Sequence, residues 1–221
     1  MPIFNRRKEP EKFTCIDSLL YSMFPAKVWM PQYRNIAESM PLNKGKILDI
    51  GTGPGLLPLE IAKRGKSLEI TGIDLSRTVI GIANINKIIN NTGNVIFQVG
   101  DGNDLAFEDG SFDLIISTNA LHHWRRPLRV LEEIYRCLKK GCYAWIFDGY
   151  GDSSLEDVKN NVAKIMGLFP PPSYFLEKIL KKHGFSKDDY HNKIRKIISQ
   201  SSFRAANFMQ KGVLMRIELF K

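Results

Sequence analysis

The chain has 221 residues, of which 43% are hydrophobic and 25% are charged, which is typical of one sizeable α/β domain and excludes a disordered chain. No apolar run approaches the ~20 residues that a membrane helix needs, so we expect no membrane partner. The polar N-terminus lacks the apolar region of a secretory signal, and the three cysteines contain no Cys-x-x-Cys pair. These features argue against a disulfide framework or a metal site and indicate the cytoplasm.

The formal net charge of +9 is spread unevenly along the chain. Residues 1–150 carry 19 basic and 16 acidic side chains, whereas residues 151–221 carry 13 basic and 7 acidic side chains. Such a basic region can bind nucleic acid or an anionic substrate, or it can be a solvated helix face. We favour the solvated face, because the region lacks the interleaved aromatic residues of single-strand binding surfaces.

A glycine-rich turn is the most informative feature. A short apolar run ends at residue 50, Gly51, Gly53 and Gly55 follow at every second position, and apolar residues then resume at helical spacing. This pattern predicts a buried strand, a tight turn and a helix. Glycine lets the backbone approach a ligand because no Cβ is in the way. The dinucleotide fingerprint needs a third glycine at position 56, which is Leu56, so the spacing disfavours an NAD-dependent dehydrogenase.

The chain then alternates strands and helices. We predict strands at 68–74, 95–99, 112–117 and 142–148, a helix that Ser76 caps, and a helix from Pro127 to about Lys139 that Gly141 ends. Alternation of this kind indicates a parallel sheet with right-handed connections and helices on both faces. Ligands bind beyond the carboxyl ends of such strands.

The last third of the chain has a different pattern. We predict helices at 155–166, 174–182 and 186–199, the last of them capped by Ser186. Two apolar stretches, 203–209 and 213–220, predict strands joined by a short loop and therefore an antiparallel hairpin.

Two motifs carry a family resemblance. The glycine turn with Asp49 two residues before Gly51 resembles motif I of the class I S-adenosylmethionine (SAM)-dependent methyltransferases. The segment 112–124, with its Phe-Asp start and its His-His-aromatic end, resembles the small-molecule, methyltransferase type 11-like branch of that family. The resemblance implies a Rossmann-like, seven-stranded, mostly parallel sheet with an antiparallel C-terminal hairpin. It also implies a methyltransferase domain at 45–221 and an N-terminal helical lid at 1–44.

The resemblance also implies a SAM site. Asp74 lies at the end of the second predicted strand, where a carboxylate can accept hydrogen bonds from both ribose hydroxyls. The residues that we expect to bind SAM are Asp49, Gly51, Thr52, Gly53, Gly55, Asp74, Leu75, Asp101, Gly102 and Asn119. Among them, Asp101 is expected at the adenine amine and Asn119 at the methionine part.

The expected reaction is in-line transfer of the SAM methyl group to a small-molecule acceptor, with release of S-adenosylhomocysteine. Such a reaction depends mainly on positioning and requires no metal. His122 and His123 are the candidates for a general base, and the alternative is that they pack against other side chains behind the site. Two further functions remain open: methylation of RNA or protein, and SAM binding without catalysis. The chain lacks the Asn/Asp-Pro-Pro-aromatic motif of amino-modifying nucleic-acid enzymes, and Ser117 to Ala120 stand in its place.

Overall fold

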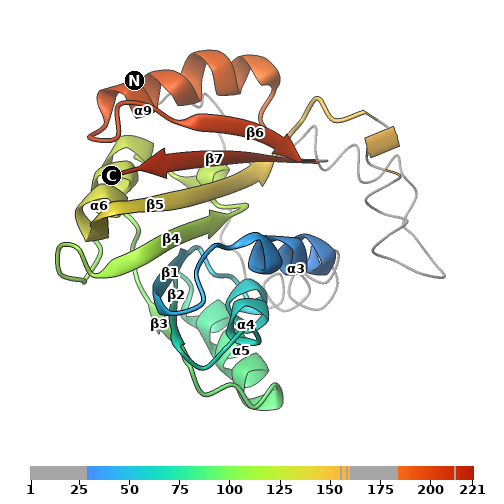
Figure 1. Ribbon diagram of the computed structural model, residues 1–221. Helices are drawn as coiled ribbons and strands as arrows, with labels where there is room; N and C mark the ends of the chain where they lie inside the picture. The colour runs from blue at the N-terminus through green and yellow to red at the C-terminus, as the bar shows by residue number, and fades with distance from the viewer. Residues whose placement is uncertain (1–28, 155, 158, 160–183, 212) are drawn as a thin grey trace.

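The computed structural model describes residues 29–154, 156, 157, 159, 184–211 and 213–221. Its centre is a seven-stranded sheet with the strand order β3-β2-β1-β4-β5-β7-β6 (Figure 1). The strands are β1 (Gly45–Ile50), β2 (Leu68–Asp74), β3 (Val95–Val99), β4 (Phe112–Thr118), β5 (Leu138–Gly149), β6 (Asn207–Lys211) and β7 (Leu214–Phe220). Strands β1 to β5 pair in parallel, whereas β7 is antiparallel to both β5 and β6. The predicted fold class is confirmed.

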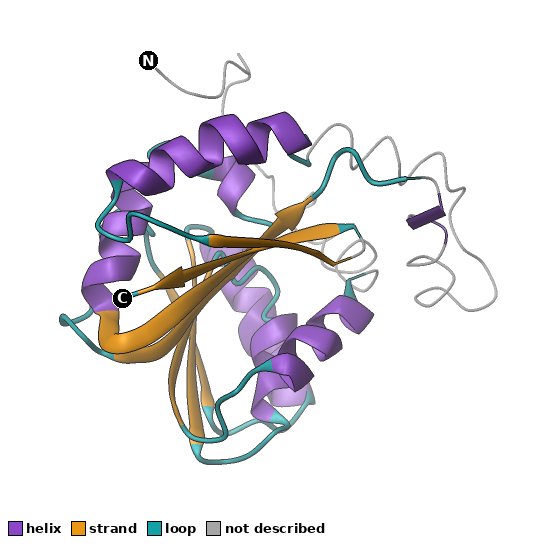
Figure 2. Ribbon diagram, turned by 45° about the horizontal axis from the view of Figure 1, so that its top comes forward, coloured by secondary structure: helices purple, strands orange, loops and turns teal. Residues whose placement is uncertain are grey.

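Helices cover both faces of the sheet (Figures 1 and 2). The helices are α3 (Met30–Ser39), α4 (Leu56–Ala62), α5 (Arg77–Ile89), the short η1 (Leu121–His123), α6 (Pro127–Cys137), the wide π-helical turns η2 (Asp189–Ile194) and α9 (Arg195–Gln200). One apolar core joins α3, α4 and α5 to one face, and a second core joins α6, η2 and α9 to the other. Because Ile47 and Leu48 of β1 belong to different cores, this strand is buried on both faces, as a central parallel strand should be.

The predicted ends of several elements are confirmed. The strands at 68–74 and 95–99 have the predicted bounds. The hydroxyl of Ser76 accepts a hydrogen bond from Val79 N at 3.3 Å and caps α5. Ser186 accepts one from Asp189 N at 3.1 Å, which satisfies a backbone donor at the start of η2. The capping residues were therefore reliable guides to where these helices begin.

The prediction that Gly141 ends the helix from Pro127 is wrong. Helix α6 ends at Cys137, and β5 begins at Leu138. The register of β5 against β4 shifts between Leu138 and Tyr143, so the intervening residues bulge from the ladder. Gly141 takes a φ of +78° in this bulge and donates its N–H to the carbonyl of Lys221 at 2.9 Å. The glycine therefore serves a bulge within the strand.

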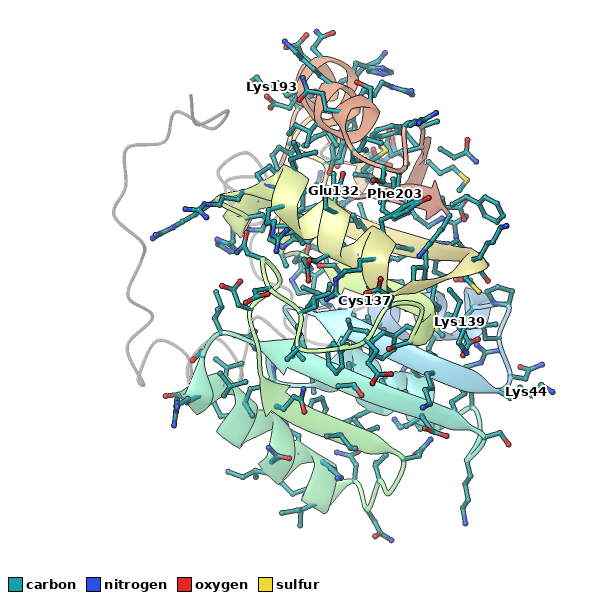
Figure 3. The ribbon with its side chains drawn as sticks, turned by 90° about the vertical axis from the view of Figure 1, so that its left-hand side faces the viewer. Lys44, Glu132, Cys137, Lys139, Lys193 and Phe203 are labelled. Carbon is teal, nitrogen blue, oxygen red and sulfur yellow. The ribbon has the colours of Figure 1, made fainter. Side chains whose placement is uncertain are left out.

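The hairpin is confirmed, but its first strand is shorter than predicted. Strand β6 begins at Asn207, and the predicted start, Phe203, is buried against α6, where its ring lies 5.1 Å from that of Tyr135. Glu132 of α6 accepts hydrogen bonds from Ser202 N at 2.8 Å and from Ser202 Oγ at 2.6 Å. Figure 3 shows Glu132 and Phe203 close together between α6 and the C-terminal part of the chain. These contacts hold residues 202 and 203 outside the ladder.

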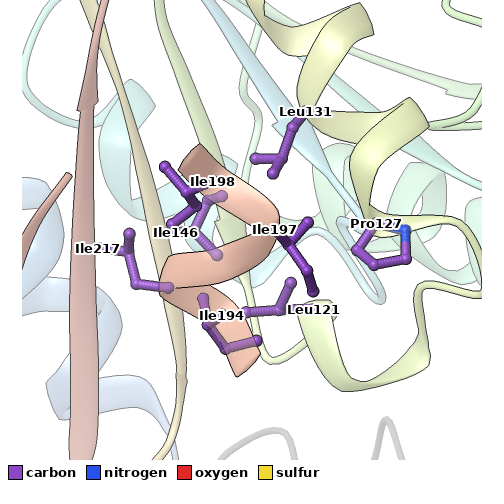
Figure 4. Close-up of a pocket in the computed structure, with 8 residues that line it drawn as sticks. All are labelled: Leu121, Pro127, Leu131, Ile146, Ile194, Ile197, Ile198 and Ile217. Carbon is purple, nitrogen blue, oxygen red and sulfur yellow. The ribbon is translucent and has the colours of Figure 1, made fainter. Parts of the chain in front are cut away.

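A small cavity lies between α6, α9 and the sheet (Figure 4). Its lining is entirely apolar: Leu121, Pro127, Leu131, Ile146, Ile194, Ile197, Ile198 and Ile217. These side chains belong to one of the two apolar cores or adjoin it, so the cavity is an imperfection in core packing.

Part of the prediction lies outside the described residues. This holds for residues 1–28 of the expected N-terminal lid and for most of the two helices expected at 155–166 and 174–182. Helix α3, which belongs to the same expected lid segment, buries Ile36 and Ala37 in the core that α4 shares. Among the described residues, no helix has both the length and the apolar character to cross a bilayer.

Candidate functional site

The turn after β1 holds the three alternating glycines, and they do different things. Gly51 has a φ of +74°, and a Cβ there would lie 2.7 Å from the Cβ of Ala120. Gly55 has a φ of +78°, and a Cβ there would enter the ring of Phe97. Gly53 has a φ of +55°, and nothing lies within 4 Å of where its Cβ would be. Gly53 is therefore the position where a ligand can approach the backbone.

Strand β2 and helix α5 hold this turn in place. Gly51 N and Thr52 N both donate to the carbonyl of Ile73 at 2.9 Å, and Gly53 N donates to Asp74 Oδ2 at 3.1 Å. Asn86 of α5 donates through Nδ2 to the carbonyl of Pro54 at 2.9 Å, a contact that the sequence pattern did not reveal. These backbone N–H groups are thus used inside the protein, and the side chains at the turn remain for a ligand.

Asp74 lies at the end of β2, as predicted. Its Oδ2 accepts the Gly53 N–H, and its Oδ1 accepts the Ser76 N–H at 2.9 Å. Burial raises the pKa of this carboxyl group, and the two backbone N–H donors offset part of the rise. Each oxygen keeps a second lone pair, so the carboxylate can still accept hydrogen bonds from a pair of hydroxyls.

Asp49 is the least satisfied polar group at the turn. Its side chain is fully buried, and neither carboxylate oxygen has a hydrogen-bond partner of acceptable geometry; the same holds for the hydroxyl of Thr52. Burial raises the pKa of Asp49 to about 7, the nearby Thr52 hydroxyl lowers it, and the negative charge of Asp74 raises it. A buried carboxylate without partners is costly, and a cationic or hydrogen-bond-donating ligand would remove that cost.

The turn after β3 lies beside the glycine turn. A Cβ on Gly102 would lie 3.2 Å from Cγ2 of Ile50, at the end of β1. Asp101 is exposed, and its Oδ1 accepts hydrogen bonds from both N and Nδ2 of Asn103 at 2.8 Å. Leu75, which follows Asp74, is 69% exposed and presents an apolar surface at the same edge. These residues therefore lie at the same edge of the sheet as the glycine turn.

The segment after β4 completes this edge of the sheet. Ser117 Oγ donates to the carbonyl of Ile50 at 2.8 Å, which joins the ends of β4 and β1. Asn119 has a φ of +52° and donates its backbone N–H to the carbonyl of Phe147 at 2.8 Å. The left-handed backbone at Asn119 changes the direction of the chain after β4. The next residue, Ala120, then lies against Gly51 of the glycine turn.

His122 and Asp148 form a pair at the ends of β4 and β5. His122 Nδ1 lies 2.8 Å from Asp148 Oδ1 and 3.0 Å from Oδ2. The ring of His123 lies 4.0 Å from that of His122. The Asp148 side chain is buried, with 1% of its surface exposed, and it contacts His122. The sequence contains both residues at strand ends, although nothing in their spacing indicated that they pair.

Comparison with known proteins finds a family match for the central part of the chain. Residues 48–146 match the family described as "Methyltransferase domain". The chain is 31% identical over 131 residues to a demethylmenaquinone methyltransferase of Porphyromonas gingivalis, covering 58% of this chain and 53% of that protein. It is 34% identical over 140 residues to the demethylmenaquinone methyltransferase of Thermotoga maritima, covering 63% and 57%. The chain spans about half the length of the curated relatives it matches.

The fold has a solved counterpart across its whole length. A protein of Methanococcus maripaludis, described as a SAM-dependent methyltransferase, superposes with a TM-score of 0.75 at 20% identity and covers 97% of this chain and 96% of that chain. This likeness concerns the fold, including the C-terminal hairpin that the family match does not reach. In its glycine turn, its sheet order and its match over residues 48–146, the chain resembles the class I SAM-dependent methyltransferases.

Proposed function

We propose that the protein binds SAM at the carboxyl edge of the sheet and transfers its methyl group to a small-molecule acceptor. The observation that carries this proposal is the pair of buried, unpartnered side chains at the glycine turn, Asp49 and Thr52. SAM carries an ammonium and a sulfonium group, and a carboxylate at this position matches that charge. The sulfonium activates the methyl group for in-line attack when the cofactor is bound, so the protein has chiefly to position the two reactants.

The cofactor would lie along the ends of β1, β2 and β3. Asp49 and Thr52 would contact the methionine part, where Gly53 leaves open space beside the backbone. The carboxylate of Asp74 would accept the ribose hydroxyls, and the exposed side chain of Leu75 would pack on the base. Gly51 and Gly55 shape the turn, and Asp101, Gly102 and Asn119 would complete the pocket at the neighbouring strand ends.

A quinone-type aromatic molecule is our candidate for the acceptor, and the cytoplasm is the expected location. The two relatives described above are named as demethylmenaquinone methyltransferases, which supports a small aromatic acceptor.

Three basic side chains among the described residues of the last third of the chain have partners within the protein. Lys193 pairs with Asp189, the Arg195 guanidinium lies 4.2 Å from the centre of the Phe208 ring, and Arg216 pairs with Glu218 at 3.0 Å. These cations are therefore used within the protein.

Calorimetry tests the cofactor. We expect S-adenosylhomocysteine to bind and NAD not to bind. The variant D74N should lower the affinity for S-adenosylhomocysteine by roughly tenfold or more, because an amide offers one acceptor oxygen where the carboxylate offers two. The exposed Asp188 provides a matched control, and D188N should bind like the unmodified protein. Binding of NAD without S-adenosylhomocysteine would overturn the proposal.

A product screen tests the reaction. The full chain is incubated with SAM labelled in the methyl group, together with a demethylated quinone in its reduced hydroquinone form, a metabolite extract or RNA. Label in the quinone or in another small molecule supports the proposal. Label in RNA would show that the acceptor is RNA and not a small molecule. Absence of label from all three, with S-adenosylhomocysteine still bound, would favour a SAM-binding protein without catalysis.

A further inference from the structure

The carboxylate of Asp148 is held on several sides. Besides the ring of His122, it accepts the backbone N–H of His122 through Oδ2 at 3.0 Å and the backbone N–H of Gly149 through Oδ1 at 2.7 Å. The His122 side chain is 16% exposed and that of Asp148 is 1% exposed. The carboxylate therefore cannot rotate without losing backbone hydrogen bonds, and the orientation of the imidazole follows from it.

This arrangement selects one tautomer of His122. An ionised carboxylate only accepts hydrogen bonds, so the nitrogen that faces it has to carry the proton. In the neutral ring, Nδ1 is then protonated and Nε2 has the lone pair. The backbone N–H of His122 binds the same carboxylate, so the ring and its own backbone are anchored at one point.

We propose that His122 is the general base of the reaction and that Asp148 is its positioning residue; this inference rests on the proposed function. A lone pair of the acceptor atom forms a bond to the methyl carbon. The bond from that carbon to sulfur breaks, and its electron pair goes to the sulfur. The proton of the acceptor atom moves to Nε2 of His122. The imidazolium that forms is stabilised by the Asp148 carboxylate and returns its proton to water after the product leaves.

The geometry favours His122 over His123. His122 has a fixed ring orientation because Asp148 holds both its ring and its backbone. His123 is exposed, and its ring lies against that of His122 with an interplanar angle of 45°. A base has to be held in position while the acceptor aligns with the methyl group, and a buried carboxylate supplies that constraint.

The tautomer can be measured without any acceptor. Two-dimensional ¹H–¹⁵N spectra of the full chain, labelled with ¹⁵N-histidine, distinguish a protonated ring nitrogen from one with a lone pair. At a pH where the ring is neutral, we expect Nδ1–H in the unmodified protein and in H123Q, which also helps to assign the signals. In D148N, an NH₂ group takes the place of one of the two oxygens that lie near Nδ1, and it can donate a hydrogen bond to a ring nitrogen that has a lone pair. We therefore expect Nε2–H in that variant.

The activity of the same variants provides the second readout. Once a labelled acceptor is known, D148N should lower kcat by about 10²-fold or more, while S-adenosylhomocysteine binds with unchanged affinity. The variant H191Q, which replaces an exposed histidine in η2, is the matched control and should keep full activity.

The results separate this inference from the proposed function. Nε2–H in the unmodified protein, or Nδ1–H retained in D148N, would overturn the role of Asp148 even when S-adenosylhomocysteine binds. Unchanged kcat in D148N would do the same. Failure of the unmodified protein to bind S-adenosylhomocysteine would instead overturn the proposed function, whatever the tautomer.

Discussion

Asp49 and Asp148 are each the penultimate residue of a parallel strand, and both side chains are almost completely buried. Their surroundings differ sharply. Asp148 binds two backbone N–H groups and a histidine ring, whereas neither oxygen of Asp49 has a hydrogen-bond partner. Burial alone therefore does not define the role of a carboxylate. A satisfied one positions its neighbours, and an unsatisfied one at the same edge marks where a ligand belongs.

The sharpest test of this difference is the variant D49N. The folded state raises the pKa of Asp49 from 3.8 to about 7, so it binds this proton more strongly than the unfolded chain does. The stability of the unmodified protein is thus lowered as the pH rises from about 4 to 7 and is constant above that. At pH 8 we expect D49N to be more stable by about 4 kcal/mol.

Urea unfolding of both proteins at pH 8 and pH 4 measures this effect. The gain of D49N should shrink to a small value at pH 4, where Asp49 is neutral in the folded state. Equal stability of the two proteins at pH 8 would show that the buried, ionised Asp49 carboxylate does not destabilise the folded protein.

The variant D148A should be less stable than the unmodified protein, whereas D49N should be more stable. D148A removes the acceptor of three N–H groups in a buried place, and each lost hydrogen bond costs about 1 kcal/mol. We expect a loss of stability of about 3 kcal/mol at pH 8, visible as a lower midpoint in urea. If D148A were as stable as the unmodified protein, the contrast between the two aspartates would disappear.

The variant T52V should gain less stability than D49N. The Thr52 hydroxyl is buried without a partner, and valine has nearly the same shape. Removal of an unsatisfied hydroxyl should stabilise the chain by about 1 kcal/mol. Thermal unfolding at pH 5, where Asp49 is neutral in the folded state, is the appropriate measurement. A loss of stability would indicate that the hydroxyl has a favourable contact.

The smallest expected effect is proton release on cofactor binding. At pH 7 about half of the Asp49 side chains are protonated, given the pKa of about 7. A cationic group beside the carboxylate favours the ionised form, so binding of S-adenosylhomocysteine should release up to about half a proton. Calorimetry in two buffers of different ionisation enthalpy detects this release. D49N should release none, and equal release by both proteins would contradict the placement of the ligand.

Local patterns predicted most of the sheet. The strands at 68–74 and 95–99 and the caps Ser76 and Ser186 follow from alternation and capping chemistry, which depend on neighbouring residues. The start of β5 did not follow, because a glycine after a helical stretch is compatible with either a helix end or a bulge. Only the pairing with the C-terminal Lys221 decides between them.

The candidate site was predictable as a set of strand ends, but its internal contacts were not. The strand-end rule gathers Asp49, Asp74 and Asp148 at one edge, and His122 joins them from η1. Which carboxylate binds a histidine and which stays unpaired depends on packing across three strands, and no sequence periodicity encodes that. The support of the glycine turn by Asn86 is likewise a contact between residues 32 positions apart.

One aromatic ring limits the size of two other residues. A Cβ on Gly72 would lie 2.7 Å from Cδ1 of Phe97, and a Cβ on Gly55 would enter the same ring. A Cβ on Gly72 would also lie 2.5 Å from Oγ1 of Thr52, so position 72 should covary with both 52 and 97, with alanine at 72 only where both of these residues are smaller. Position 55 should stay glycine even then, because its φ of +78° excludes other residues for a separate reason. An alignment can thus distinguish Gly55, which is required by its backbone conformation, from Gly72, which is required by the side chains beside it.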